Sequence, residues 1–149
     1  MKLMGLVLTV VSCGLLIAVG NSQDAAVNAQ KEQQIETAKR VKELRATRIA
    51  TLKSMTELVT RRYQNAMTSA DELYEAKLLL LNAEVDAAET DSDRMKLLQG
   101  IVEVMKEYEE TAEAMVKSAR ANPTLVLKAK AKRLEAEIAL EQCKGMTRD

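Results

Sequence analysis

The sequence predicts an all-α protein, an elongated antiparallel helical hairpin or coiled coil made of three long helices. Ala, Glu, Lys, Leu and Arg dominate its composition, as they do in long helices and coiled coils. Between residues 24 and 121 there is no Pro, and the one Gly is Gly100. No segment alternates strictly between apolar and polar residues, so we expect no strands. Phe and Trp are absent, which argues against a compact globule with a bulky aromatic core.

Residues 1–20 are predicted to be a signal peptide. A short basic start containing Lys2 precedes an uncharged stretch, residues 3–20, which ends in small residues before a polar segment. Two alternatives stay open. The stretch approaches the roughly 20 residues that span a bilayer, so it could be a retained anchor. Cys13, after Val10-Val11-Ser12, could instead be acylated as in lipoproteins.

Residues 21–149 are predicted to form one helical coiled-coil domain, whose first helix covers about 24–66. Its beginning, residues 24–40, is polar and rich in Gln, so we expect it to fray or overhang. Beyond it, large apolar side chains recur at spacings of three and four, which places one apolar stripe along a helix. These residues are Leu44, Ile49, Leu52, Met55, Leu58, Val59 and Tyr63.

The second helix is predicted over about 70–120. Ser69 and Glu72 form the S-x-x-E pattern of a capping box, which starts a helix. Residues 90–93, Thr-Asp-Ser-Asp, are a second candidate break, but nothing there forbids continuation, so we expect one helix to pass through. Its later half carries a heptad seam with one polar exception. The seam consists of Leu98, Val102, Met105, Glu109, Ala112, Val116 and Ala119.

The third helix is predicted over about 124–143. Asn122 is a favoured N-cap, and Pro123 suits the first helical position, where its missing N–H is not needed. Short turns make neighbouring helices antiparallel. We expect the seam residues of the last two helices to pack against partners, chiefly Leu98, Val102, Met105, Leu134 and Ile138.

An internal repeat relates the two halves, residues 44–89 and 94–142. The segment Tyr74 to Val85 aligns with Leu127 to Ile138 at an offset of 53 residues (127 minus 74), and Ala, Lys, Leu and Glu recur in register. The segment YQNAMTSADELYEAKLLLLNAE resembles the signature of TolC-type outer-membrane efflux proteins, through Tyr63, Ser69, Leu73, Ala76 and Ala83. The second copy resembles it through Val126, Ala129 and Ala136.

That resemblance implies tandem helical hairpins, as in the wall of a periplasmic tunnel. The sequence departs from the family in two ways. The turn Gly of the family is Ala66 in the first copy and Ala119 in the second. No segment could supply the β-strands with which the family builds its barrel. A family-derived hairpin without that barrel is what the resemblance supports.

Composition argues against most chemistry. There are 22 basic and 22 acidic residues, so no excess of positive charge favours nucleic-acid binding. His, the commonest general base, is absent. No nucleophile set, metal-ligand spacing or phosphate loop occurs. The basic run Lys128 to Arg133 and the acidic run Lys106 to Glu113 are expected to be solvated helix flanks. We therefore expect no enzymatic activity, no metal and no cofactor.

The sequence thus indicates an exported protein of the bacterial periplasm or envelope that acts as a structural or interaction module. Its expected partner is a second copy or another envelope coiled-coil protein, and it would touch the membrane only through an uncleaved N-terminus. Cys143 lies in a polar tail and is expected to be exposed, although it could form an intermolecular disulfide. The alternative is a small holdase chaperone similar to Skp-type proteins.

Overall fold

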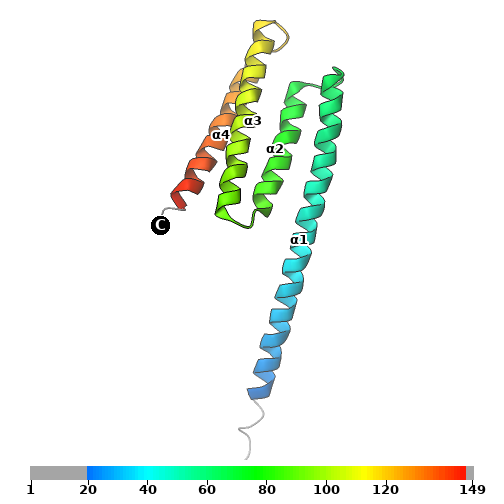
Figure 1. Cartoon of the computed structure of the whole chain (residues 1–149), viewed down its shortest axis with the longest axis vertical. Helices are drawn as coiled ribbons and strands as arrows, with labels where there is room; N and C mark the ends of the chain where they lie inside the picture. Colours follow the sequence, from blue (N-terminus) through cyan, green and yellow to red (C-terminus); the bar gives the residue numbers. More distant parts are fainter. Residues whose placement is uncertain (1–19, 147–149) are drawn as a thin grey trace, which may run out of the picture. The chain divides into compact units, whose positions relative to one another are not determined.

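A computed structural model describes the backbone of residues 20–146 and the side chains of residues 28 and 30–146. It contains four helices, α1 (Gly20–Gln64), α2 (Ala70–Ala87), α3 (Asp91–Lys117) and α4 (Thr124–Met146), shown in Figure 1. No strand occurs within the described residues, so the prediction of an all-α fold is confirmed. The predicted signal segment lies outside the described residues except for Gly20, where α1 begins.

The prediction of one helix over 70–120 is wrong, because the chain breaks between α2 and α3. Ala88 and Thr90 both adopt extended backbone conformations, with φ/ψ of −60°/128° and −126°/149°. Thr90 caps α3, since its hydroxyl oxygen accepts a hydrogen bond of 3.1 Å from the backbone N–H of Asp93. The same hydroxyl donates to the Asp93 carboxylate at 2.7 Å. The break lets α3 fold back against α2.

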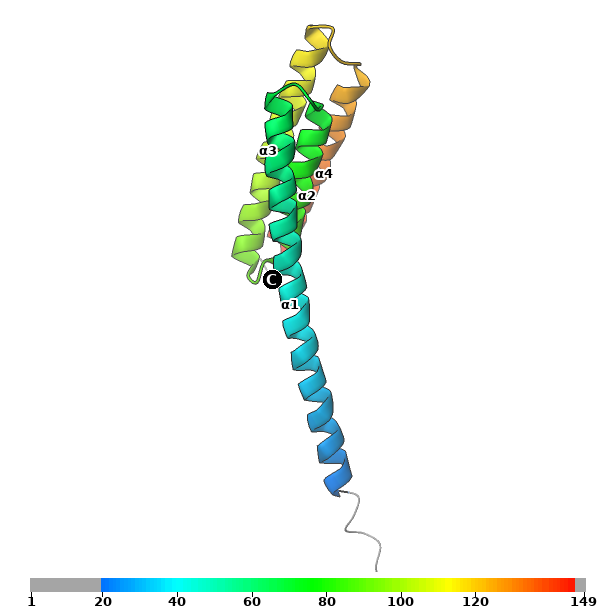
Figure 2. The same cartoon turned by 90° about the vertical axis from the view of Figure 1, so that its right-hand side faces the viewer.

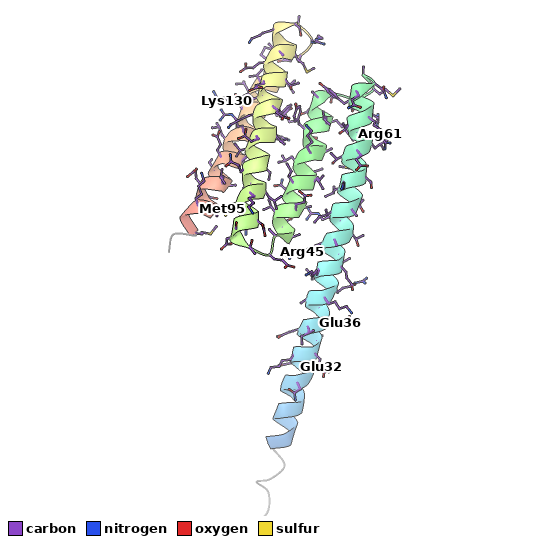
Figure 3. The ribbon with its side chains drawn as sticks, in the orientation of Figure 1. Glu32, Glu36, Arg45, Arg61, Met95 and Lys130 are labelled. Carbon is purple, nitrogen blue, oxygen red and sulfur yellow. The ribbon has the colours of Figure 1, made fainter. Side chains whose placement is uncertain are left out.

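The chain divides into two units, residues 1–40 and 41–149. In the first unit, the helix continues through residues 20–40 instead of fraying. Every side chain described there is exposed, including Ile35 at 68%. Glu32 and Glu36 of this unit are labelled in Figure 3. Among the described helices, none combines the length and apolar character needed to cross a bilayer.

The second unit has its main core where α3 packs against both α2 and α4, which lie on either side of α3 in Figure 1 and can be traced from another direction in Figure 2. Met105 and Tyr108 of α3 are the largest fully buried side chains. The other core members are Ala70, Tyr74, Leu98, Ile101, Val102, Ala112, Ala129, Ala136, Leu140 and Cys143. Their burial removes apolar surface of three helices from water, which is the main stabilising contribution to this unit.

A smaller cluster joins α1 to α2. Val59 of α1 packs with Leu73 and Ala76 of α2, and Tyr63 covers the cluster. Two polar contacts extend the same pairing: the Thr56 hydroxyl donates to the backbone oxygen of Ala76 at 3.1 Å, and Arg48 pairs with Asp86 at 2.9 Å. From residue 41 onward, Val59 is the one buried residue of α1. This part of α1 therefore uses a single face.

Candidate interaction surface

The turn after α1 closes in a left-handed conformation. Ala66 has a φ of 56°, which costs an L-residue roughly 1–2 kcal/mol relative to Gly. Its N–H donates to the Tyr63 carbonyl at 2.9 Å, and the Met67 N–H donates to the Arg62 carbonyl at 2.8 Å. This pair of bonds is the Schellman motif, which satisfies the last carbonyls of a helix.

The turn after α3 repeats that geometry. Ala119 has the same φ of 56°, its N–H donates to Val116 at 2.9 Å, and the Arg120 N–H donates to Met115 at 2.8 Å. Each of these residues lies 53 positions after its equivalent in the first turn (119 minus 66). The backbone thus adopts a glycine-like conformation at both sites without glycine.

The predicted caps lie at the starts of α2 and α4. Ser69 accepts a hydrogen bond of 3.2 Å from the Glu72 N–H, while the Glu72 carboxylate accepts from the Thr68 hydroxyl. Asn122 accepts from both the N–H and the hydroxyl of Thr124, at 2.9 and 2.8 Å. Pro123 directly precedes α4, and its carbonyl accepts from Val126 at 3.1 Å. The hydrogen bonds of these residues fix where the hairpins turn.

The expected packing residues divide between two environments. Leu98, Val102 and Met105 are buried, at 7%, 4% and 0% exposure. Leu134 and Ile138, by contrast, remain 43% and 59% exposed. On α4 the inward positions are instead taken by Ala129, Ala136, Leu140 and Cys143. The small Ala side chains let α4 approach α3 closely, and Leu134 and Ile138 lie on the opposite, outward side of α4.

Cys143 is buried, at 3% exposure, within the main core. The expectation of an exposed thiol is therefore wrong, because the last turns of α4 continue the packed face into what reads as a polar tail. In this conformation the sulfur lies out of reach of another chain. An intermolecular disulfide at Cys143 would require α4 to open.

Two tyrosines form a contact that sequence reasoning missed. The rings of Tyr74 and Tyr108 stack with centroids 4.8 Å apart and planes inclined by 26°. The Tyr108 hydroxyl donates to Asp71, and the Tyr74 and Thr111 hydroxyls share a hydrogen bond of 3.1 Å. Lys128 of α4 reaches the Asp71 carboxylate at 2.7 Å. The only sequence signal was that two of the three aromatic residues flank the break between α2 and α3.

The electrostatics of this cluster favour a fixed charge state. Burial raises the pKa of Tyr108, and its hydrogen bond to the Asp71 carboxylate raises it further. Burial opposes ionisation of Asp71, but hydrogen bonds from Lys128 and Tyr108 outweigh it and lower the pKa of the carboxyl. A neutral phenol and an ionised carboxylate are held together at neutral pH. The cluster therefore ties α2, α3 and α4 to one another.

The basic run on α4 is engaged in ion pairs. Lys128 and Lys132 reach Glu75 of α2 at 3.1 and 3.4 Å. Arg133 pairs with Glu109 of α3 and with Glu137, the latter at 2.6 Å. Acidic side chains of α2, α3 and α4 thus pair with basic side chains of this run. Within the described residues, no group of three or more His, Cys, Asp or Glu could hold a metal ion. All buried side-chain nitrogen and oxygen atoms described have hydrogen-bond partners.

Among the described residues of the second unit, most of the exposed large apolar side chains lie on α1 and α4, with Leu79 of α2 and Met67 of the first turn as exceptions. The side chains of both helices are drawn in Figure 3, where Arg61 and Lys130 are labelled. The α1 face consists of Leu44, Met55 and Leu58, at 55%, 36% and 53% exposure. The α4 face consists of Leu127, Leu134 and Ile138, at 68%, 43% and 59%. Grouped exposed apolar side chains are typical of protein interaction sites. These two faces are the candidate interaction surface.

Comparison with known proteins returns no relative. No protein-family model matches the sequence, no curated protein matches it, and no solved structure matches the fold. The resemblance to TolC-type proteins therefore stays a prediction that rests on the residues quoted for it.

Proposed function

We propose that this chain is a non-enzymatic, exported envelope protein of a bacterium that works as a helical interaction module. The α1 and α4 faces are its contact surfaces, and its partner is a second copy or another envelope coiled-coil protein. The observation that carries the proposal is the exposure of large apolar side chains on both faces, from Met55 at 36% to Leu127 at 68%. Such side chains gain free energy when a partner removes them from water.

The surroundings of the polar side chains support a non-enzymatic role. Tyr108 and Asp71 are held by hydrogen bonds in the charge states that stabilise their contact. The polar groups at Ser69 and Asn122 are used in helix caps. What the described part of the chain offers a ligand is therefore apolar surface and not converging reactive groups.

A relationship to TolC-type proteins is part of this proposal, limited to the helical hairpins. It is supported by the matching turns at Ala66 and Ala119, where the backbone has the conformation that favours glycine. Export and an envelope location are proposed on the N-terminal sequence, Lys2 followed by the uncharged residues 3–20. Participation in efflux would follow only from a partner that belongs to an efflux system.

The deciding experiment is cross-linking in the native envelope followed by mass spectrometry. We expect the chain in the envelope fraction, with cross-links from residues of α1 or α4 to one defined neighbour. The mature N-terminus, read from the same peptides, is expected near Asn21. A chain that begins at Met1 in the cytosolic fraction would contradict export. Cross-links confined to α2 and α3 would contradict the proposed surface.

A holdase of the Skp type is the second candidate, because the same exposed apolar faces could hold an unfolded chain. The test is aggregation of an unfolded outer-membrane protein in the presence of equimolar full-length chain. Suppression of aggregation that is lost in the variant Leu127→Glu would favour the holdase. No protection at equimolar amounts would exclude it.

A further inference from the structure

The contact between α2 and α3 joins the two halves of the repeat. We use it as the template for a second contact of the same kind, between two chains. The hairpin α1–α2 belongs to the first half and the hairpin α3–α4 to the second. We use counterpart for the residue 53 positions away in the other half. By this relation the counterpart of α2 is α4, and the counterpart of α3 is the part of α1 after residue 41. A second α2–α3 contact would therefore join α4 of one chain to α1 of another.

The centre of the template is the contact of Tyr74 with Tyr108 and Thr111, in which both tyrosines are buried, at 7% and 0% exposure. The counterpart of Tyr74 is Leu127, and the counterparts of Tyr108 and Thr111 are Met55 and Leu58. All three are large and apolar. They are exposed at 68%, 36% and 53%. The buried centre of the existing contact thus corresponds to an exposed apolar trio.

Later residues of α2 show the same difference, with burial in the α2–α3 contact and exposure of the counterpart. Leu81 and Val85 are partly buried against the main core, and their counterparts Leu134 and Ile138 are exposed. These residues account for the whole α4 face. Leu44 of the α1 face is likewise the counterpart of Leu97, which is half-buried on α3.

Positions that pack inside each hairpin behave differently. Ala76 packs with Val59 of α1 and is 3% exposed. Its counterpart on α4, Ala129, is 0% exposed in the core shared with α3. The counterpart of Val59 itself, Ala112, is also buried at 0%. Positions that pack inside a hairpin are thus buried in both halves. Positions that join one half to the next are buried where α2 meets α3, whereas their counterparts on α4 and α1 are exposed.

The charges fit the same arrangement. In the template, Asn82 of α2 lines a small hollow together with Leu98 and Ile101 of α3, and Lys132, Glu135, Ala136 and Ala139 of α4 border the same hollow. The counterpart of Asn82 is Glu135, and the counterparts of Leu98 and Ile101 are Arg45 and Arg48. A second contact would therefore place a carboxylate beside two guanidinium groups, of which Arg48 also pairs with Asp86 of its own chain at 2.9 Å. Opposite charges at the rim of an interface fix its register and discourage wrong pairings.

We propose that the chain associates with copies of itself head to tail, the α4 face of one copy docking on the α1 face of the next. The inference rests on the proposed function and names its partner. Because the two faces differ, the contact is heterologous, and each pair of chains leaves one α1 face and one α4 face available. Association therefore continues beyond two chains and gives either a closed ring or an open assembly.

The test uses two full-length variants purified in mild detergent, Leu58→Glu in the α1 face and Leu127→Glu in the α4 face. Each variant alone is expected to lose association beyond the monomer, weakened by roughly 30-fold or more, the loss typical of removing a central interface residue. When the two are mixed, the intact α4 face of the first meets the intact α1 face of the second. The mixture is expected to give a discrete dimer by light scattering.

A matched control is Leu79→Lys. Leu79 is an exposed leucine of α2, at 48%, and its counterpart is Lys132, so a lysine is already accepted at that position of the repeat. We expect this variant to associate like the wild type. Weakened association in Leu79→Lys, to the same degree as in Leu58→Glu, would overturn the proposal by showing that any exposed leucine matters.

Other outcomes also separate the two proposals. A wild-type chain that is helical by circular dichroism but monomeric at high concentration would overturn self-association and leave a different partner for the same faces. A mixture of the two variants that stays monomeric while the wild type associates would overturn the head-to-tail contact. A wild-type chain without helical structure would overturn the interaction module as well.

Discussion

Helix α3 and the part of α1 after residue 41 are counterparts in the repeat, yet they lie in different environments. On α3, six residues are buried, including Met105 and Tyr108 at 0% exposure. On that part of α1, Val59 alone is buried, and Met55, the counterpart of Tyr108, is 36% exposed. The difference arises because α3 packs against both α2 and α4, while α1 is held through α2.

The comparison teaches that the apolar pattern of a helix does not fix how much of it is buried. Both helices carry large apolar side chains at spacings of three and four. The number of neighbouring helices decides which of those side chains leave the water. Exposed members of such a pattern therefore point to a neighbour that is supplied from outside the chain.

The largest expected effect tests the burial difference directly. Met105→Ala should lower the free energy of unfolding by about 2–5 kcal/mol, because a fully buried side chain leaves a cavity. Its counterpart variant, Leu52→Ala, should cost clearly less, since Leu52 is only half-buried. Urea unfolding followed by circular dichroism, at one low protein concentration, measures both. Equal losses would show that the two helices are equally packed.

The second effect concerns the tyrosine cluster that α3 has and α1 lacks. Tyr108→Phe removes a hydrogen bond to the ionised Asp71 and should cost about 1.5–3 kcal/mol. Tyr74→Phe removes a neutral bond to Thr111 and should cost about 0.5–1.5 kcal/mol. The same unfolding measurement ranks them. A larger loss in Tyr74→Phe than in Tyr108→Phe would contradict this ranking, because it would make the hydrogen bond to Thr111 stronger than the one to Asp71.

The third effect uses what the two halves share. Ala66→Gly and Ala119→Gly should each raise the free energy of unfolding by about 1 kcal/mol, because both residues have a φ of 56°. The control is Ala50→Gly on the exposed side of α1, where the same substitution should lower it by about 1 kcal/mol. Thermal unfolding gives the sign. Destabilisation at either turn would contradict the left-handed conformation there.

The smallest effect is the pH dependence contributed by Asp71. Its pKa in the folded chain lies below the ordinary value of 3.8, so its contribution to stability is present above pH 3.8. That contribution is lost as the pH falls through the lowered pKa. The wild type should therefore lose more stability than Asp71→Asn between pH 7 and pH 3, measured by urea unfolding. Parallel losses would show that the contact with Lys128 and Tyr108 contributes nothing to acid sensitivity.

Local pattern predicted much of the fold because helix ends are decided by nearby residues. The all-α class and the caps at Ser69 and Asn122 depend on a few neighbouring side chains and backbone groups. The break before α3 was harder to predict. Thr90 and Asp93 had the spacing of a cap, but Ala87 and Ala88 also favour helix continuation. What tips the balance is remote: in one straight helix Tyr74 and Tyr108 would lie about 50 Å apart, whereas folded back their rings stack at 4.8 Å.

The sequence by itself therefore determined the all-α class, the starts of α2 and α4 and the positions of the two hairpin turns, since those follow from interactions within a few residues. Tertiary structure alone decided that α2 and α3 separate, that Cys143 is buried and that Leu134 and Ile138 face outward. These outcomes depend on which helices become neighbours. Burial is a property of the pair of packed surfaces, and neither surface contains that information alone.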